Sequence, residues 1–124
     1  MITKIDIITR PNKLEDLKEA LNAIGVMGMT VSQVFGCGLS KGHKEIYRGR
    51  AYDVNLVPKV KLETVVCDVP VEDVIEAAQS VLRTGQMGDG KIFVYHLADA
   101  VRIRTGERGD RAIQDTAAAS EGAT

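Results

Sequence analysis

Two hydrophobic periodicities alternate twice along this chain, and their order restricts the folds that it can adopt. Residues 2–9 alternate imperfectly, as a strand does, and residues 13–24 place apolar side chains at helical spacing. A second strand pattern follows at 29–35. After an irregular stretch, the strand–helix–strand order returns at 59–67, 71–83 and 91–97. This order predicts an α+β domain with the ferredoxin-like βαββαβ plan, an antiparallel sheet that carries both helices on one face.

Local signals mark where the two helices begin and end. Asn12 and Glu15 match the spacing of a capping box, which predicts that Asn12 caps the first helix. Gly25 suits the C-terminal cap of that helix. Asp68 and Pro70 precede the second helix and predict its start.

The stretch between 36 and 57 has no clear apolar face. A loop of this length inside a compact domain is usually either functional or disordered. Its tyrosines and arginines belong to the residue types that dominate protein-binding hot spots. We predict that residues 37–57 form a partner-binding loop, and the alternative is a flexible hairpin whose charges keep it soluble. The proposed contact residues are Tyr47, Arg48, Arg50 and Tyr52.

The chain length of 124 residues indicates one domain. We place it at 1–113, and we expect residues 114–124 to be a disordered tail because they have too little apolar bulk to pack. Apolar residues fall on both sides of several predicted strands, so the sheet needs cover on its second face. This predicts an oligomer that packs through the sheet.

Glycines gather where the second helix passes into the last strand. Residues 84–91 read Thr-Gly-Gln-Met-Gly-Asp-Gly-Lys. Glycine permits positive φ and a close approach of a ligand to the backbone, and successive exposed N–H groups form an anion site. We interpret Gly88, Asp89, Gly90 and Lys91 as a phosphate cradle. The stretch matches neither the P-loop nor the dinucleotide pattern, so a glycine-rich turn without a ligand is the alternative.

Two arginines near the C-terminus offer a second set of anion ligands. Val101–Arg104 is interpreted as a short strand, and a period of two would place Arg102 and Arg104 on one face. Guanidinium groups aimed the same way suit a phosphate or a carboxylate. The alternative is a solvated strand edge whose charges discourage aggregation.

Composition excludes several classes of function. A formal net charge of -1 argues against direct nucleic-acid binding. No apolar run of about eighteen residues is present, and the first residues lack a signal peptide's apolar region. Cys37 and Cys67 have neither metal-site nor disulfide spacing, which predicts a cytoplasmic protein. Because no catalytic triad or carboxylate cluster appears, we predict neither an enzyme nor a metal-ligand cluster of protein side chains.

Four stretches together resemble the PII nitrogen-regulatory signalling proteins. They are residues 41–49, 56–61, 83–94 and 101–107. The resemblance extends over about 1–113 and implies a homotrimer of ferredoxin-like subunits. It also implies an adenine-nucleotide site in each cleft between subunits, where ATP and ADP compete as effectors. Residues 37–57 resemble the family's T-loop, which docks onto target proteins.

The resemblance also implies roles for individual residues. The cradle at 88–91 would hold the nucleotide phosphates, and Arg102 and Arg104 would reach them from the neighbouring subunit. The residues that would line the rest of the nucleotide are Thr30, Gly36, Gly38, Leu39 and Val65. Many family members have an arginine where this chain has Leu39, which removes one phosphate contact.

The T-loop departs from the family at two further positions. Members usually carry a glutamine just before Lys-Gly-His, where it ligates the Mg²⁺ that bridges ATP and 2-oxoglutarate; here that residue is Ser40. We therefore expect a weak or absent 2-oxoglutarate response, although the other residues of that site are present as Lys41, Gly42 and Lys59. Tyr52 occupies the position that uridylylated members modify, but Arg50 and Ala51 alter its surroundings.

By resemblance, the partners are an ammonium transporter, glutamine synthetase or a nitrogen-related transcription regulator. Contact with a membrane would then occur only through such a partner. Two alternatives remain for the same clefts. One is a PII-like sensor of another small ligand, such as bicarbonate or AMP, which Leu39 and Ser40 leave open. The other is a slow ATP phosphohydrolase.

Overall fold

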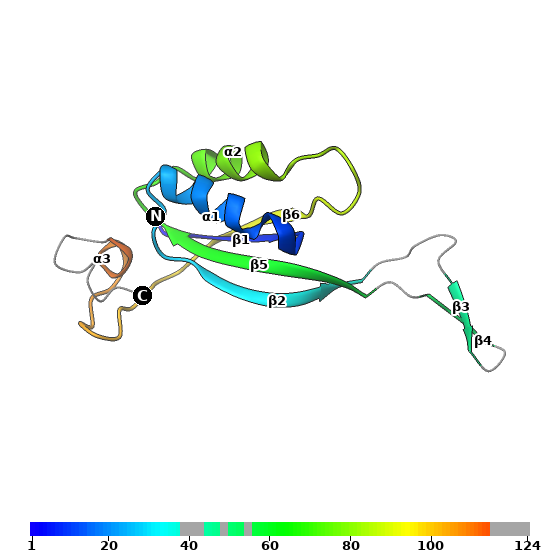
Figure 1. Ribbon diagram of the computed structural model, residues 1–124. Helices are drawn as coiled ribbons and strands as arrows, with labels where there is room; N and C mark the ends of the chain where they lie inside the picture. The colour runs from blue at the N-terminus through cyan, green and yellow to red at the C-terminus, as the bar shows by residue number, and fades with distance from the viewer. Residues whose placement is uncertain (38–43, 48–49, 54–55, 115–124) are drawn as a thin grey trace.

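The structure is a computed structural model, and it describes residues 1–37, 44–47, 50–53 and 56–114 (Figure 1). The elements are, in chain order, β1 (Thr3–Thr9), the short 3-10 helix η1 (Pro11–Lys13), α1 (Leu14–Ala23), β2 (Thr30–Gly36), β3 (Lys44–Tyr47), β4 (Arg50–Asp53), β5 (Val57–Val66), α2 (Val71–Leu82), β6 (Lys91–His96) and α3 (Asp110–Ile113).

Four strands form the main sheet in the order β2-β5-β1-β6, and every neighbouring pair is antiparallel. Helices α1 and α2 lie together on one face of this sheet (Figure 1). The predicted ferredoxin-like plan is therefore confirmed. Strands β3 and β4 pair with each other in a separate ribbon, so the segment between 36 and 57 contains regular structure that its periodicity did not reveal.

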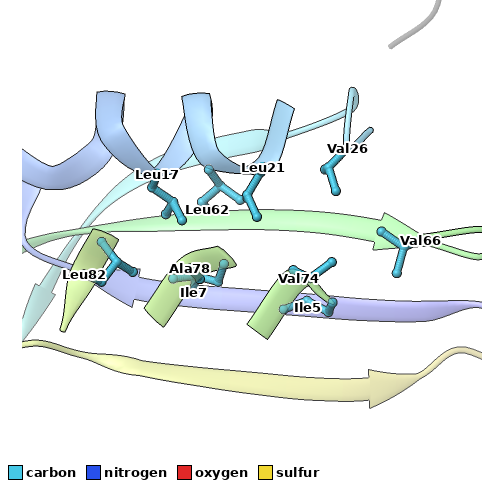
Figure 2. Close-up of a cluster of buried hydrophobic side chains, with 10 residues drawn as sticks. All are labelled: Ile5, Ile7, Leu17, Leu21, Val26, Leu62, Val66, Val74, Ala78 and Leu82. Carbon is cyan, nitrogen blue, oxygen red and sulfur yellow. The ribbon is translucent and has the colours of Figure 1, made fainter. Parts of the chain in front are cut away.

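The hydrophobic core fills the space between the two helices and the sheet (Figure 2). Leu17 and Leu21 from α1 and Val74 from α2 are fully buried against β1 and β5. Ile5 and Ile7 point toward them from the central strand β1. Each such side chain contributes about 1.5–3 kcal/mol through removal of apolar surface from water. This core fixes the ends of β1 and α2, and the candidate site lies where those ends meet.

The start of α1 differs from the prediction that Asn12 is its cap. Asn12 lies inside η1, and Lys13 occupies the N-cap position without any side-chain capping bond. Pro11 is the physical reason, because its fixed φ opens a 3-10 turn in which the Arg10 carbonyl accepts the Lys13 N–H at 3.1 Å. The capping-box spacing is therefore present in the sequence but not used.

The end of α1 follows the sequence signal. Gly25 has φ of 96°, and its N–H donates to the Asn22 carbonyl at 3.1 Å. The N–H of Val26 donates to the Leu21 carbonyl at 3.0 Å. These two bonds make a Schellman motif, and burial of both Leu21 and Val26 adds the hydrophobic contact that commonly accompanies it.

The second face of the sheet is less apolar than expected. Two residues from β1 and two from β5 form a charge cluster there: Lys4, Asp6, Lys61 and Glu63. The ammonium of Lys61 lies 3.0 Å from Glu63 Oε1, and this hydrogen bond is the main cause of the raised pKa of Lys61 and the lowered pKa of Glu63. Exposed apolar side chains on this face come chiefly from β6.

The C-terminal region also differs from the prediction. Val101–Arg104 is not a strand, because Val101 forms a single bridge with Arg108 and the residues between them turn. The Gly106 N–H donates to the Arg102 carbonyl at 2.7 Å, which closes that turn. Among the described residues, no helix is both long and apolar enough to cross a membrane.

Candidate anion-binding site between α2 and β6

The loop that joins α2 to β6 is organised around the carboxylate of Asp89. Oδ2 accepts the backbone N–H groups of Thr84 at 2.8 Å and Gly85 at 2.9 Å. Oδ1 accepts the Thr84 hydroxyl and Arg10 Nη1, each at 2.5 Å. The Thr84 hydroxyl and amide, followed by the Arg10 guanidinium, hold the pKa of Asp89 far below its ordinary value. The carboxylate is therefore anionic, and its oxygens are used inside the loop.

Three other side-chain donors bind carbonyls of the same loop. Arg10 Nη2 donates to the Met87 carbonyl at 2.8 Å, and Lys59 Nζ donates to the Gly88 carbonyl at 2.7 Å. The Thr9 hydroxyl donates to the Asp89 carbonyl, also at 2.8 Å. The loop is thus tied to the end of β1 by two residues and to β5 by one.

Glycine is required where the loop crosses the end of β1. Gly90 has φ of 108°, and a Cβ at this position would lie 1.8 Å from the Ile8 carbonyl oxygen. Gly88 has φ of 97°, and a Cβ there would lie 3.0 Å from Arg10 Nη2. A larger residue at either position would push the loop away from the side chains that hold it.

The donors that an anion needs are present in this loop. Within the described residues, the N–H groups of Gly88, Asp89 and Gly90 donate to no protein acceptor. Lys91 follows them directly, with an exposed side chain. A cleft of about 570 Å³ runs along the loop between α2 and β6. Its polar lining is Gln79, Arg83, Gly85, Gln86, Asp89, Gly90 and Lys91, and its apolar lining comes from residues such as Ile75, Leu82 and Ile92.

Two other residues from the sequence analysis lie beside this loop. Gly36 ends β2 and pairs with Val57 at the start of β5. Lys59 passes close to Gly36, since a Cβ built on that glycine would lie 3.4 Å from Lys59 Cγ. The strands that lead into and out of the T-loop segment therefore adjoin the phosphate cradle through Lys59.

The predicted arginine pair lies elsewhere in the chain. Arg102 donates to the carbonyls of Ala112 at 3.3 Å and Gln114 at 2.9 Å, and it pairs with Glu107 at 3.6 Å. Arg104 is exposed in the turn. The C-terminal region that follows β6 lies at the opposite end of the sheet from the α2–β6 loop (Figure 1). Because β6 has 6 residues and each step between neighbours rises about 3.4 Å, roughly 17 Å or more separates the two groups.

Val65 lies toward that same distant end, and Thr30 lies near the middle of the sheet. Thr30 is the first residue of β2 and is opposite Glu63, whereas Gly36 is the last. Val65 is opposite Lys4, near the end of β5. One chain therefore divides the predicted site residues into two groups. The first group contains Gly36, Lys59 and residues 88–91, and the second contains Val65 and the segment after β6 that carries Arg102 and Arg104, with Thr30 between the two groups.

The remaining predictions concern the T-loop segment. Gly38, Leu39, Ser40, Lys41, Gly42 and Arg48 lie outside the described residues. The backbone register is described for the ribbon, with Tyr47 opposite Arg50 and Tyr52 opposite Glu45. Their roles as partner contacts or as a modification site stay predictions.

Sequence reasoning missed three residues that build the loop: Thr9, Arg10 and Thr84. Thr84 was part of the glycine-rich stretch but was given no role. Thr9 is predicted only as the end of the strand at 2–9 and Arg10 has no predicted role, and both lie about 80 positions from the residues that they bind. The one local signal was a charged residue directly before Pro11, where a strand must stop.

Known proteins are similar to this chain in both sequence and fold. Residues 2–107 match the family described as Nitrogen regulatory protein P-II. The chain is 54% identical over 110 residues to Nitrogen regulatory protein P-II of Rhodospirillum rubrum, across 89% of this chain and 98% of that protein. It is 50% identical to the Nitrogen regulatory PII-like protein of Bacillus subtilis, across 89% of this chain and 95% of that protein.

Two solved structures show the same similarity. The structure of B. subtilis GlnK gives a TM-score of 0.76 at 49% identity, and the match covers 90% of this chain and 97% of that one. The B. subtilis GlnK-ATP complex also gives a TM-score of 0.76, at 46% identity, and that match covers 90% of this chain and 94% of the other.

Proposed function

Because this chain belongs to the P-II family of nitrogen regulatory proteins, we propose that it is a non-enzymatic regulator that binds ATP or ADP between subunits of a homotrimer. Nucleotide occupancy would set the conformation of the T-loop segment, residues 37–57, and this segment would then bind or release a target protein. Such a switch works through the ligand's charge, which favours one arrangement of a loop over another.

The observation that carries this proposal is the division of the anion ligands between opposite ends of one sheet. A cradle with Lys91 lies at one end, and the segment after β6, which contains Arg104, lies at the other (Figure 1). One chain does not bring these two groups together. Two copies placed side by side, with opposite sheet ends adjacent, would complete the site. The similarity to a GlnK-ATP complex supports a nucleotide as its ligand.

The test is a calorimetric titration of nucleotide-free protein with ATP, ADP and AMP. We expect ATP and ADP to bind, and we expect Lys91→Ala to weaken both. Lys18→Ala is the matched control, because Lys18 pairs with Glu15 on α1 and lies outside the loop. Absence of measurable heat with both ATP and ADP would overturn the proposal.

We further propose that the response to 2-oxoglutarate is weak. Ser40 is too short to replace a glutamine as a Mg²⁺ ligand, and Mg²⁺ requires nearly ideal octahedral geometry. Lys59, the residue that would pair with the 2-oxoglutarate carboxylate, is hydrogen-bonded to Gly88 in this structure. Tight binding of 2-oxoglutarate in the presence of Mg-ATP would contradict this, and Ser40→Gln is expected to strengthen that binding.

The targets that fit this proposal are an ammonium transporter, glutamine synthetase or a nitrogen-related transcription regulator. The protein would act in the cytoplasm and reach a membrane only through such a target. Tyr52 is a proposed modification site, and mass spectrometry of protein from nitrogen-starved cells checks it.

A second candidate is a PII-like sensor of bicarbonate or AMP, which is favoured by the departures from the family at Leu39 and Ser40. The AMP arm of the titration, repeated with bicarbonate, separates this candidate from the first. Slow ATP hydrolysis in the same cleft is tested by a turnover assay with Lys91→Ala as its control.

A further inference from the structure

We propose that Thr9, Arg10 and Lys59 are positioning residues for the anion site. They hold three consecutive carbonyls of the α2–β6 loop against the body of the domain, and the next three N–H groups are thereby presented to a phosphate. This inference rests on the proposed nucleotide function and explains how a loop that matches neither the P-loop nor the dinucleotide pattern could perform it.

The three hydrogen bonds fall on successive residues of the loop. Arg10 binds the carbonyl of Met87, Lys59 that of Gly88, and Thr9 that of Asp89, at 2.7–2.8 Å. The donors come from the end of β1 and the start of β5, two adjacent strands. Three neighbouring peptide groups are therefore oriented by side chains of the sheet.

The geometry of a trans peptide converts this anchoring into an anion site. In a trans peptide, the C=O of one residue and the N–H of the next point in opposite directions. The described chain has no cis peptide bond. When the carbonyls of 87, 88 and 89 point toward their donors, the N–H groups of 88, 89 and 90 point away. Those are the N–H groups that lack a protein acceptor among the described residues.

The hydrogen bonds accepted by the Asp89 carboxylate hold the loop in this arrangement. Its carboxylate occupies the N–H groups of Thr84 and Gly85, so the amides of that first turn are committed within the loop. Arg10 joins the two sets of contacts, because one guanidinium nitrogen binds this carboxylate and another binds the Met87 carbonyl. The entropy of ordering the loop is then lost on folding rather than on binding, which favours affinity.

The inference specifies the chemistry of the ligand. Backbone N–H groups in such a concavity recognise phosphate oxygens and make no contact with a base. Loss of one of these three donor side chains is therefore expected to weaken the binding of ATP, ADP and inorganic tripolyphosphate by the same factor. A defect in the base-binding part of the cleft would instead weaken the nucleotides and spare tripolyphosphate.

Thr9→Val is the sharpest variant, because it keeps the shape of a β-branched side chain and removes one donor. Thr9 is 1% exposed, and its hydroxyl bond to Asp89 is its one side-chain bond within the described residues. The matched control is Thr3→Val, a threonine on the same face at the other end of β1 that is 4% exposed. Loss of one hydrogen bond corresponds to a dissociation constant that is about 3- to 10-fold higher.

The experiment combines calorimetry with amide NMR of the ligand-free protein. We expect Thr9→Val to weaken ATP and tripolyphosphate equally, and to alter the chemical shift and hydrogen exchange of the Gly90 N–H before any ligand is added. Thr3→Val is expected to leave the Gly90 N–H and both affinities unchanged. Lys59→Met should act in the same way through the Asp89 N–H, with Lys18→Met as the control for lost charge.

The outcomes separate this inference from the proposed function. If the wild-type protein binds tripolyphosphate but neither nucleotide, the proposed function fails, and the positioning role is retained when Thr9→Val weakens tripolyphosphate binding and alters the Gly90 N–H. If it binds nucleotides and Thr9→Val leaves both the affinity and the Gly90 N–H unchanged, the positioning role fails and the function is retained. If it binds neither kind of anion, both are overturned.

Discussion

Asp89 is the residue on which the loop between α2 and β6 depends most. An acidic residue inside a phosphate-binding loop is unexpected, because its charge repels the ligand. Here the carboxylate accepts four hydrogen bonds, and one of them comes from the Arg10 guanidinium. The charge of Asp89 is thereby balanced within the loop, and Lys91 remains as the neighbouring cation.

Asp89→Asn is predicted to lower the melting temperature at neutral pH, because the amide cannot accept the same bonds from both Thr84 and Arg10. The folded-state pKa of Asp89 is lowered, so its stabilising contribution is complete above the unfolded-state value of about 3.9 and is lost as pH falls toward the folded-state pKa. The difference in melting temperature between wild type and variant should therefore shrink below about pH 4.

Thermal unfolding between neutral and acidic pH measures this difference. Asp16→Asn, at an exposed position in the first turn of α1, controls for the change in net charge. A difference that stays constant down to the most acidic pH would show that the ionised carboxylate is not the stabilising form.

Gly90 and Gly85 provide a second test at the scale of single residues. Both have positive φ, but a Cβ on Gly85 meets nothing within 4 Å, whereas a Cβ on Gly90 would overlap the Ile8 carbonyl. Gly85→Ala is predicted to cost about 1–2 kcal/mol from backbone strain alone. Gly90→Ala is predicted to cost about 1–3 kcal/mol more than this, because the added Cβ also overpacks against β1 and should separate the loop from that strand. Urea unfolding compares the two variants, and equal costs would contradict the close approach of Gly90 to β1.

At the scale of elements, α1 illustrates how far local sequence signals extend. Its apolar spacing and its terminal Gly25 were sufficient to predict where it lies and how it ends, because both depend on residues within two turns. Its start was predicted wrongly, since Pro11 imposes a 3-10 turn that overrides the capping-box spacing of Asn12. Local signals decide an element only where no neighbouring residue restricts the backbone more strongly.

Leu21→Ala is the prediction that belongs to this scale. Leu21 is fully buried and takes part in the Schellman motif that ends α1. Its truncation is predicted to cost about 2–5 kcal/mol, since it removes core contacts and leaves a cavity. Glu19→Ala, an exposed change in the same helix, should cost little. Chemical denaturation of both variants measures this, and equal stabilities would contradict the packing of α1 on the sheet.

The segment at 101–104 shows why a short alternation is a weak signal. Val-Arg-Ile-Arg has a period of two, but its backbone bonds close a turn with Gly106 and Glu107, and no strand of the main sheet pairs with it. The anchors of the cradle were unpredictable for the opposite reason, because Thr9 and Arg10 act on residues about 80 positions away. A glycine-rich loop therefore indicates where an anion could bind, whereas the residues that shape the loop emerge only from the fold.

At the scale of the whole molecule, the second face of the sheet is the surface that most needs a partner. Asp6 is 2% exposed, and its Oδ1 has the Lys4 ammonium 3.6 Å away as an ion-pair partner but accepts no hydrogen bond within the described residues. Phe93 and Tyr95 are 42% and 46% exposed on the adjacent strand β6. A buried acceptor without a donor is costly, and exposed aromatic residues favour burial. Both features agree with the proposed packing of subunits through this face.

Subunit mixing tests the arrangement in which one copy supplies the cradle and another supplies the arginine. Lys91→Ala disables every cradle of a homotrimer, and Arg104→Ala disables every arginine contribution, so each variant alone is predicted to bind ATP weakly. If the protein is the proposed homotrimer, mixed trimers form when the two variants are unfolded together and refolded. Each mixed trimer then has one cleft in which a subunit with intact Lys91 meets a subunit with intact Arg104.

Binding should therefore reappear in the mixture, with a wild-type dissociation constant and a reduced number of sites. Because no subunit in the mixture is wild type, binding can return only at a cleft that combines Lys91 of one subunit with Arg104 of another. The number of recovered sites therefore reports how the subunits are arranged. Lys91→Ala subunits unfolded and refolded alone are the matched control, because every cradle in that preparation lacks Lys91. Recovery in this control, or none in the first mixture, would mean that Arg104 serves no neighbouring cradle. The roughly 17 Å that separates the two groups within one chain would then have to be closed by a rearrangement of that chain itself.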